Sequence, residues 1–174
     1  MARPKRLVGI SYTGCAQYFV TSCTWDRRKV FLDRDFAQEC IESLSAISAE
    51  FGYEQIAYCF MPDHVHFLTE GDDGSKPLPA FVARWKRHTG WMWHQKAGSP
   101  LWQPGYWERV LRENDPMLSI ARYIVENPVR AKLVRDVLEY PLTGSDRYPI
   151  SEIMSAYQMD LKSGWYRNSF DMSQ

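Results

Sequence analysis

Two histidines lie two residues apart in the segment MPDHVHFL, residues 61–68. The neighbouring residues are apolar and typical of a β-strand, in which successive side chains point to opposite faces. His64 and His66 therefore share one face, whereas Val65 and Phe67 point into a core. Imidazole is the commonest metal ligand in proteins, so this pair could bind one divalent cation. The alternative is a pair of histidines on the solvent face of an ordinary strand.

A tyrosine and an asparagine four residues apart could complete such a site. Tyr123 and Asn127 share a face if the segment ARYIVENPV, residues 121–129, is helical. The amide oxygen of Asn127 could be a third metal ligand. A phenol with a pKa of about 10 is a weak nucleophile at neutral pH, so Tyr123 would need a phosphate polarised by a cation, or a nearby base. In the alternative interpretation Tyr123 is a core aromatic and Asn127 caps a short helix that starts at Pro128.

Basic residues outnumber acidic ones between residues 84 and 135, a stretch that also carries an aromatic loop around Trp102. The whole protein has 21 Lys and Arg against 21 Asp and Glu, yet residues 84–135 are locally basic. Phosphate binding would explain this asymmetry, and an aromatic loop could stack unpaired bases. The alternatives are a solvated face and buried aromatics. The candidate DNA contacts are Arg84, Lys86, Arg87, Trp102, Gln103, Arg109, Arg112, Arg122 and Arg130.

Composition narrows the class of protein. The 174 residues suit one domain with a short tail, and a net charge of zero disfavours a protein that coats DNA non-specifically. The four cysteines form no CxxC pair, which indicates reduced thiols. We find no signal peptide and no run of about 18 apolar residues, so we expect a cytoplasmic protein without a membrane span.

The pattern along the chain predicts an α+β fold. We expect a strand over residues 16–25, a helix over 33–51, a hairpin over 53–70, a helix over 78–96, a short strand over 106–112 and helices over 116–126 and 128–134. This order predicts a ferredoxin-like or RRM-like antiparallel sheet with helices packed mainly on one face. We assign residues 1–15 to a basic lead-in, 16–145 to the domain and 146–174 to a C-terminal tail.

Several motifs in order resemble the REP-associated tyrosine transposases. These relatives of the insertion-sequence-200 type belong to the single-tyrosine transposases of the histidine–hydrophobe–histidine (HUH) endonuclease superfamily. The resemblance spans roughly residues 16–145 and rests on MPDHVHFL, RWKRHT, LWQPGYWERVLR and ARYIVENPVRAKLV. It implies that His64, His66 and Asn127 bind the metal and that Tyr123 is the nucleophile. It also matches Lys86, Arg109 and Arg112 to basic positions of the family.

The chain departs from the family pattern at a few positions. Asp63 replaces a common Asn or Glu, Lys132 precedes Leu133 where Gly-Leu is common, and residues 140–145 lack the usual Trp-Pro and Ser-Ser. These differences bear on target selection more than on chemistry.

The sequence therefore predicts a Mg²⁺- or Mn²⁺-dependent DNA strand transferase. It would act on single-stranded or hairpin DNA through a 5′-phosphotyrosine intermediate. A non-catalytic single-strand-binding module, a degenerate family member and an unrelated metallohydrolase are the alternatives. The sequence leaves open whether the protein is a monomer or a homodimer that exchanges the tyrosine helix.

Overall fold

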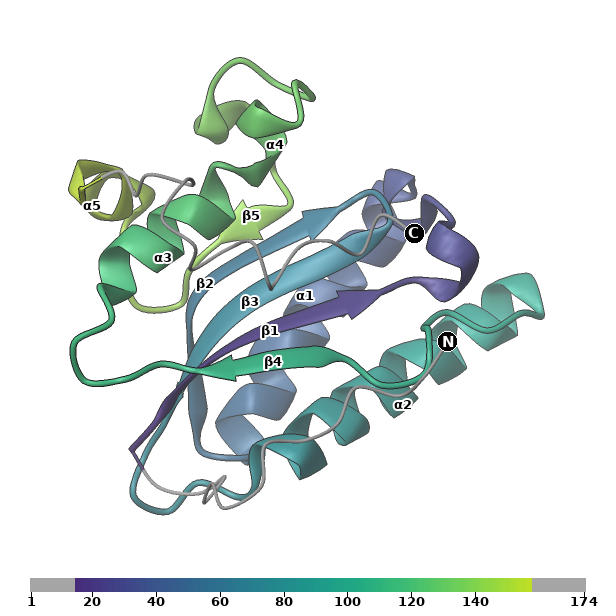
Figure 1. Ribbon diagram of the computed structural model, residues 1–174. Helices are drawn as coiled ribbons and strands as arrows, with labels where there is room; N and C mark the ends of the chain where they lie inside the picture. Colours follow the sequence, from purple (N-terminus) through teal and green to yellow (C-terminus); the bar gives the residue numbers. More distant parts are fainter. Residues whose placement is uncertain (1–14, 158–174) are drawn as a thin grey trace.

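A five-stranded antiparallel sheet forms the centre of the computed structural model, which describes residues 15–157 (Figure 1). The strands lie in the order β4-β1-β3-β2-β5. Their bounds are Gln17–Cys23 for β1, Tyr53–Met61 for β2, His64–Gly71 for β3, Trp107–Val110 for β4 and Thr143–Gly144 for β5. β3 is the central strand, so both of its edges are hydrogen-bonded to neighbours.

In the part of the chain that the structure describes, five α-helices and three short 3₁₀ turns accompany the strands. The helices are α1 (Arg34–Glu50), α2 (Leu78–Ala97), α3 (Met117–Val125), α4 (Asn127–Arg130) and α5 (Ile150–Ser155). The turns are η1 (Trp25–Arg27), η2 (Val30–Leu32) and η3 (Val137–Glu139). Within residues 15–157, no helix is long and apolar enough to cross a membrane.

Local chemistry sets the ends of the two long helices. The carboxylate of Asp33 accepts a hydrogen bond from the Phe36 amide at 3.2 Å, which caps the start of α1. Gly98 ends α2 in a left-handed conformation with φ of 63°, where glycine carries no Cβ penalty. Both boundaries lie within a residue or two of the predicted ones.

The sheet has a hydrophobic core on each face. Val65 and Phe67 point toward α1 and α2 and pack with Trp85 in one core. The alternate residue Leu68 packs on the other face, with Ile124 of α3. The predicted α+β class and antiparallel sheet are confirmed, and the two long helices share one face. α3 and α5 lie on the opposite face, to which the even-numbered residues of β3 point.

A tight turn at Pro62 and Asp63 joins β2 to β3 and sets the hairpin register. Met61 pairs with His64, and Cys59 pairs with His66. On the other edge of β3, Thr21 of β1 lies opposite His66. The hairpin predicted over residues 53–70 is thus confirmed. Proline cannot donate a ladder hydrogen bond, which explains why the strand is interrupted here.

The packed domain continues beyond residue 145, where we predicted a tail. The side chain of Arg147 binds the Glu54 carboxylate at 2.6 Å and also pairs with Glu70. Ile153 of α5 is fully buried against α3. The predicted lead-in up to residue 14 and the tail from residue 158 lie outside the described residues.

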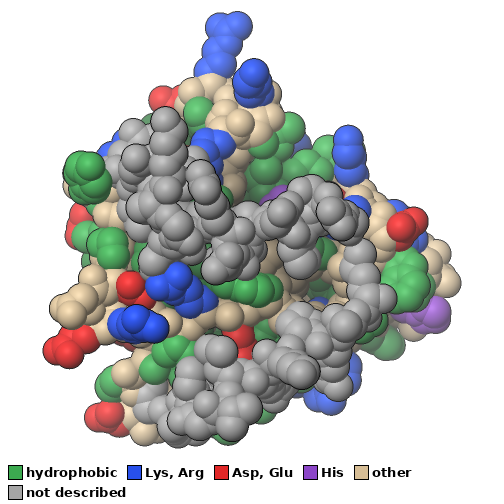
Figure 2. Space-filling view, in the orientation of Figure 1, with side chains coloured by type: hydrophobic (Ala, Val, Ile, Leu, Met, Phe, Trp, Pro, Cys, Tyr) green, Lys and Arg blue, Asp and Glu red, His purple; other side chains and the backbone are tan. Residues whose placement is uncertain are grey.

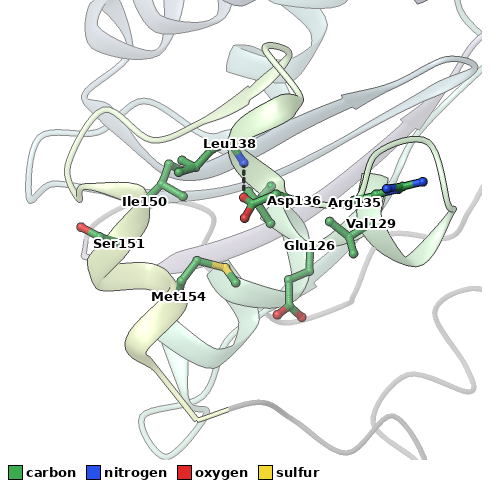
Figure 3. Close-up of a pocket in the computed structure, with 9 residues that line it drawn as sticks. Glu126, Val129, Arg135, Asp136, Leu138, Ile150, Ser151 and Met154 are labelled. Carbon is green, nitrogen blue, oxygen red and sulfur yellow. Dashed lines mark hydrogen bonds between the residues drawn. The ribbon is translucent and has the colours of Figure 1, made fainter.

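A pocket of about 350 Å³ lies between the α3–α4 junction, η3 and α5 (Figure 3). Its wall includes Val129, Leu138, Ile150 and Met154, and Glu126 borders it. None of the predicted metal ligands or the predicted nucleophile lines this pocket. The candidate chemistry therefore lies beside it, on the sheet face.

Packing of α3 on the sheet should dominate the stability of this half of the molecule. We expect Ile124→Ala to lower the free energy of unfolding by about 2–5 kcal/mol, because the fully buried side chain leaves a cavity. Leu133→Ala is the control, since Leu133 is 47% exposed and should change little. Chemical denaturation measures both, and equal losses would contradict the packing described here.

Candidate active site on the sheet face

The two histidines of β3 lie side by side on the α3 face of the sheet. Their ring centroids are 4.6 Å apart and their planes are inclined by 75°. His66 is only 1% exposed, whereas His64 is half-buried. The strand alternation predicted from the sequence therefore brings both imidazoles together.

Each imidazole is held through its Nδ1 atom. Asp63 Oδ1 lies 2.6 Å from His64 Nδ1, and Thr21 Oγ1 lies 2.8 Å from His66 Nδ1. Histidines that bind metals commonly use the second ring nitrogen in this way, which fixes the ring and its tautomer. Nε2 is then the atom through which each ring would bind a cation.

Burial favours the neutral form of His66. It lowers the pKa of this imidazole well below its usual value, and the nearby charges of His64, Arg130 and Arg27 act in the same direction. A neutral imidazole is the form that binds metal ions. α4 itself packs against β2, the strand next to the histidine strand.

Asp63 links the histidine pair to an arginine that the sequence analysis missed. Arg27 Nε lies 3.1 Å from Asp63 Oδ2, and Arg27 Nη1 lies 2.8 Å from Cys23 Sγ. Burial disfavours the Asp63 carboxylate, but the hydrogen bond from His64 and the charge of Arg27 outweigh it and lower the Asp63 pKa. The sequence does not reveal this contact, because Arg27 and Asp63 are far apart in the chain and meet only when the turn folds back.

The turn that presents Arg27 has an unusual backbone. Asp26 and Arg27 both have positive φ, at 54° and 52°, a region that non-glycine residues seldom occupy. Thr24 stabilises the turn through hydrogen bonds from Oγ1 to the carbonyls of Arg28 (2.7 Å) and Asp63 (2.9 Å). Such conformations persist only where the surroundings over-determine them, often at functional sites.

Tyr123 and Asn127 lie at the junction of α3 and α4. Tyr123 is half-buried, and the Arg130 guanidinium carbon lies 3.7 Å from the centre of its ring. Asn127 Nδ2 donates to the Ile124 carbonyl at 3.1 Å, and Asn127 Oδ1 accepts from Arg130 at 2.7 Å. Asn127 is the first residue of α4 and does not cap it, so the alternative role as an N-cap is wrong.

The phenol of Tyr123 is protonated at neutral pH. Burial raises its pKa, and the charge and hydrogen bond of Arg130 offset only part of that increase. The side chain therefore has to lose its proton during any attack.

The histidine pair has beside it, within residues 15–157, no histidine, cysteine or acidic residue that could be a third metal ligand. Among residues 15–157, no group of three or more His, Cys, Asp or Glu is arranged to hold a metal ion. The amide of Asn127 is an oxygen donor of a different type, on a helix that packs against the same face of the sheet as the histidines.

Comparison with known proteins identifies the family. Residues 13–127 match the family of IS200-like transposases. The chain belongs to this family. A REP-associated tyrosine transposase of Escherichia coli is 26% identical over 150 residues, which cover 77% of this chain and 87% of that protein. A Haemophilus influenzae protein, provisionally given the same name, is 26% identical over 157 residues, or 82% of this chain and 86% of its own.

A solved structure has the same fold as this transposase. A REP-associated tyrosine transposase bound to a REP hairpin superposes with a TM-score of 0.69 and 20% sequence identity, over 94% of this chain and 97% of that chain. The predicted resemblance to this group is confirmed, and with it the assignment of the protein as an enzyme of the tyrosine transposase type.

Two of the predicted DNA contacts are engaged within the transposase, with Trp102 buried and Lys86 half-buried. Trp102 is 9% exposed, donates from Nε1 to Thr89 Oγ1 at 2.9 Å and packs 5.0 Å from the Trp85 ring centre. Its ring is therefore part of the α2 core and cannot stack on an unpaired base in this fold. Lys86 donates to the carbonyls of Gln103 (3.0 Å) and Gly105, which anchors the Trp102 loop to α2.

The predicted basic residues do not form one patch around the histidines. Arg109 lies on the histidine face, since its cross-strand partner is Phe19, and it pairs with Asp115 at 3.5 Å. Arg122 binds Glu126 at 2.9 Å and the Ala156 carbonyl at 2.6 Å. Arg84 and Arg87 belong to α2 on the opposite face, Gln103 is half-buried, and Arg112 is exposed.

The half-buried side chain of Lys86 should make the free energy of unfolding depend on pH. Burial lowers its pKa from 10.5 to about 8, although two carbonyls stabilise the charged form. At a pH between the folded-state pKa of about 8 and the ordinary pKa of 10.5, Lys86 is protonated in the unfolded chain and neutral in the folded protein. The free energy of unfolding should therefore increase with pH over this range. We expect this increase in the wild type relative to Lys86→Met, measured by urea denaturation from pH 7 to 10. If the free energy of unfolding changed with pH in the same way in both proteins, the lowered pKa of Lys86 would be contradicted.

Proposed function

We propose that this transposase cuts and rejoins single-stranded DNA beside hairpins, with Tyr123 as nucleophile and Mg²⁺ or Mn²⁺ held by His64, His66 and Asn127. The observation that carries the proposal is the anchoring of both imidazoles through Nδ1, by Asp63 and Thr21, on the sheet face where α3 packs. The relative that was solved with a REP hairpin supports DNA hairpins as the substrate.

The candidate ligands suit a divalent cation. Two neutral imidazoles and one amide oxygen form a mixed nitrogen and oxygen donor set, which leaves room for phosphate oxygens and water. When bound, Mg²⁺ or Mn²⁺ would polarise a non-bridging phosphate oxygen and compensate the charge that develops there.

Tyr123 would perform the covalent step. Its Oη attacks the scissile phosphorus and loses its proton, while the bond from phosphorus to the 3′ oxygen breaks and that oxygen takes up a proton. The products are a 5′-phosphotyrosine and a free 3′-hydroxyl. A second 3′-hydroxyl can reverse the reaction and join strands, and no nucleotide cofactor is needed because the phosphodiester energy is kept in the phosphotyrosine.

Exposed cations near the site could hold the DNA backbone. Figure 2 shows Lys and Arg side chains projecting over α4 and the segment that follows it, where Lys132 and Arg135 are exposed. Arg27 adds a partly exposed guanidinium beside Asp63, and Arg109 lies on the same face as the histidines. Arg84, Arg87, Gln103 and Arg112 stay candidate contacts to DNA outside the immediate site.

A DNA-binding module without catalysis is the competing function. It would not require Asp63 and Thr21 to orient the imidazoles, so the observed hydrogen bonds favour the enzyme. Such a module would bind a hairpin equally well with a chelator present and after His64→Ala.

A covalent adduct tests the proposed reaction. The protein is mixed with a 3′-labelled hairpin oligonucleotide with a single-stranded flank and Mn²⁺, and a labelled protein band should survive denaturing electrophoresis. We expect no band after Tyr123→Phe or with EDTA, because either change removes an essential part of the site. Tyr157→Phe is the control. Tyr157 is 81% exposed, so this variant should form the adduct as the wild type does. An adduct formed by Tyr123→Phe would exclude Tyr123 as the nucleophile.

Thr21→Val tests the anchoring of His66. The change removes the Oγ1 atom that contacts Nδ1 and keeps the side-chain shape, so Mn²⁺ affinity should fall by about 10–100-fold. Isothermal titration of DNA-free protein measures the affinity. Thr143→Val is the control, because Thr143 binds the Tyr58 carbonyl on the edge strand β5. Unchanged affinity in Thr21→Val, with complete loss in His64→Ala, would show that this hydrogen bond does not orient the ligand.

A further inference from the structure

One guanidinium touches both members of the Tyr123–Asn127 pair. Arg130 Nη2 donates to the Tyr123 carbonyl and to Asn127 Oδ1, both at 2.7 Å. Its Cζ atom lies 3.7 Å from the centre of the Tyr123 ring, within the range of a cation–π contact. Arg130 was predicted to bind DNA phosphates, but its side chain is turned inward onto the proposed nucleophile and the proposed third ligand.

These contacts determine which way the Asn127 amide points. An arginine has only donors, and a carbonyl has only acceptor sites. Arg130 therefore requires the amide oxygen on its side, and the Ile124 carbonyl requires the amide nitrogen on the other. A flipped amide would lose both hydrogen bonds. Since Oδ1 has two lone pairs, it can accept from Arg130 and still offer the second to a cation.

Glu126 reduces the electrostatic cost of placing a cation near Arg130. Its carboxylate lies 3.7 Å from Arg130 Nη1 and 2.9 Å from Arg122 Nε, and Glu126 is only 9% exposed. Arg122 in turn donates to the Ala156 carbonyl at the end of α5. The guanidinium of Arg130 is thus partly neutralised and fixed by a chain of polar contacts, so its orienting effect should exceed its repulsion of a bound metal.

We propose that Arg130 is a positioning residue that sets the Asn127 oxygen for the metal and holds the Tyr123 ring, rather than a DNA contact. The proposal rests on the proposed function, since it assigns Asn127 a metal to bind. Only a planar guanidinium can donate to the Tyr123 carbonyl and to Asn127 Oδ1 while its face packs on the Tyr123 ring. Lysine, a compact point charge, should not replace it.

Metal affinity of the DNA-free protein tests this role. We expect Arg130→Met and Arg130→Lys to weaken Mn²⁺ binding by about 10–100-fold, as loss of a group that orients a ligand usually does. In an Asn127→Ala background, Arg130→Met should cause no further loss, because the residue acts through the amide. An equal loss in both backgrounds, or unchanged or tighter binding in Arg130→Met, would overturn the proposal.

A second variant separates orientation from folding. Both oxygens of a carboxylate can bind a metal, so Asn127→Asp removes the need to choose between two amide orientations. Arg130→Met should then have less than a threefold effect on Mn²⁺ affinity in that background. Arg34→Met is the matched control, since Arg34 is exposed at the start of α1 on the opposite face of the sheet, and should leave affinity unchanged. A full loss in the Asn127→Asp background would assign Arg130 a structural role only.

Kinetics with the hairpin substrate distinguish positioning from DNA binding. In Arg130→Met the rate of adduct formation at saturating DNA should fall, with the Kd for the hairpin within twofold of wild type. A phosphate contact would instead weaken binding and reduce the salt slope by about one, and that result would overturn the proposal. If wild-type protein binds no Mn²⁺, the proposed function fails; if it binds Mn²⁺ and Arg130→Met is unchanged, only the role of Arg130 fails.

Discussion

The register between β1 and β3 is the constraint on which the whole site depends. It places Thr21 opposite His66, so that a threonine hydroxyl meets a buried imidazole at 2.8 Å. A slip of one residue would turn both histidines toward the α1–α2 core and bring Val65 and Phe67 to the other face. The apolar residues of β3 prevent that slip, because they would lose their burial. The same packing that stabilises the sheet therefore fixes the position of the candidate metal ligands.

The candidate site also requires that α3 pack on the face of the sheet opposite to α1 and α2. α3 buries Ile120 and Ile124 against the sheet, which carries Tyr123 and Asn127 to the histidine side. The polar contacts of Glu126 with Arg122 and Arg130 lie at the end of this helix. Buried ion pairs are weak evidence for stability, but breaking one by removing a partner is costly. These contacts connect the end of α3 to Arg130 of α4 and, through Arg122, to the Ala156 carbonyl that follows α5.

The motifs were easier to predict than the roles of individual basic residues. The His64–His66 pair, the hairpin and the helices follow from periodicity, which depends on local geometry alone. Lys86 and Trp102 looked like DNA contacts, yet they anchor a loop and fill the core. Composition cannot distinguish a lysine that faces solvent from one that meets backbone carbonyls, because that depends on which loop folds against the helix. Arg27 and Thr21 were missed for the same reason, since their partners are about 40 residues away in sequence.

The sequence by itself determined the family, the order of the elements from β1 to α4 and the alternation that puts two imidazoles on one face. These properties follow from side-chain type and spacing, because the periodicity of a strand or helix fixes the face to which each side chain points. Only the tertiary structure decided what each polar group meets: Asp63 and Thr21 on the imidazoles, and Arg130 on Tyr123 and Asn127. Contacts between distant segments depend on strand register and helix packing, and those are set by the fit of the whole core rather than by any one stretch of residues.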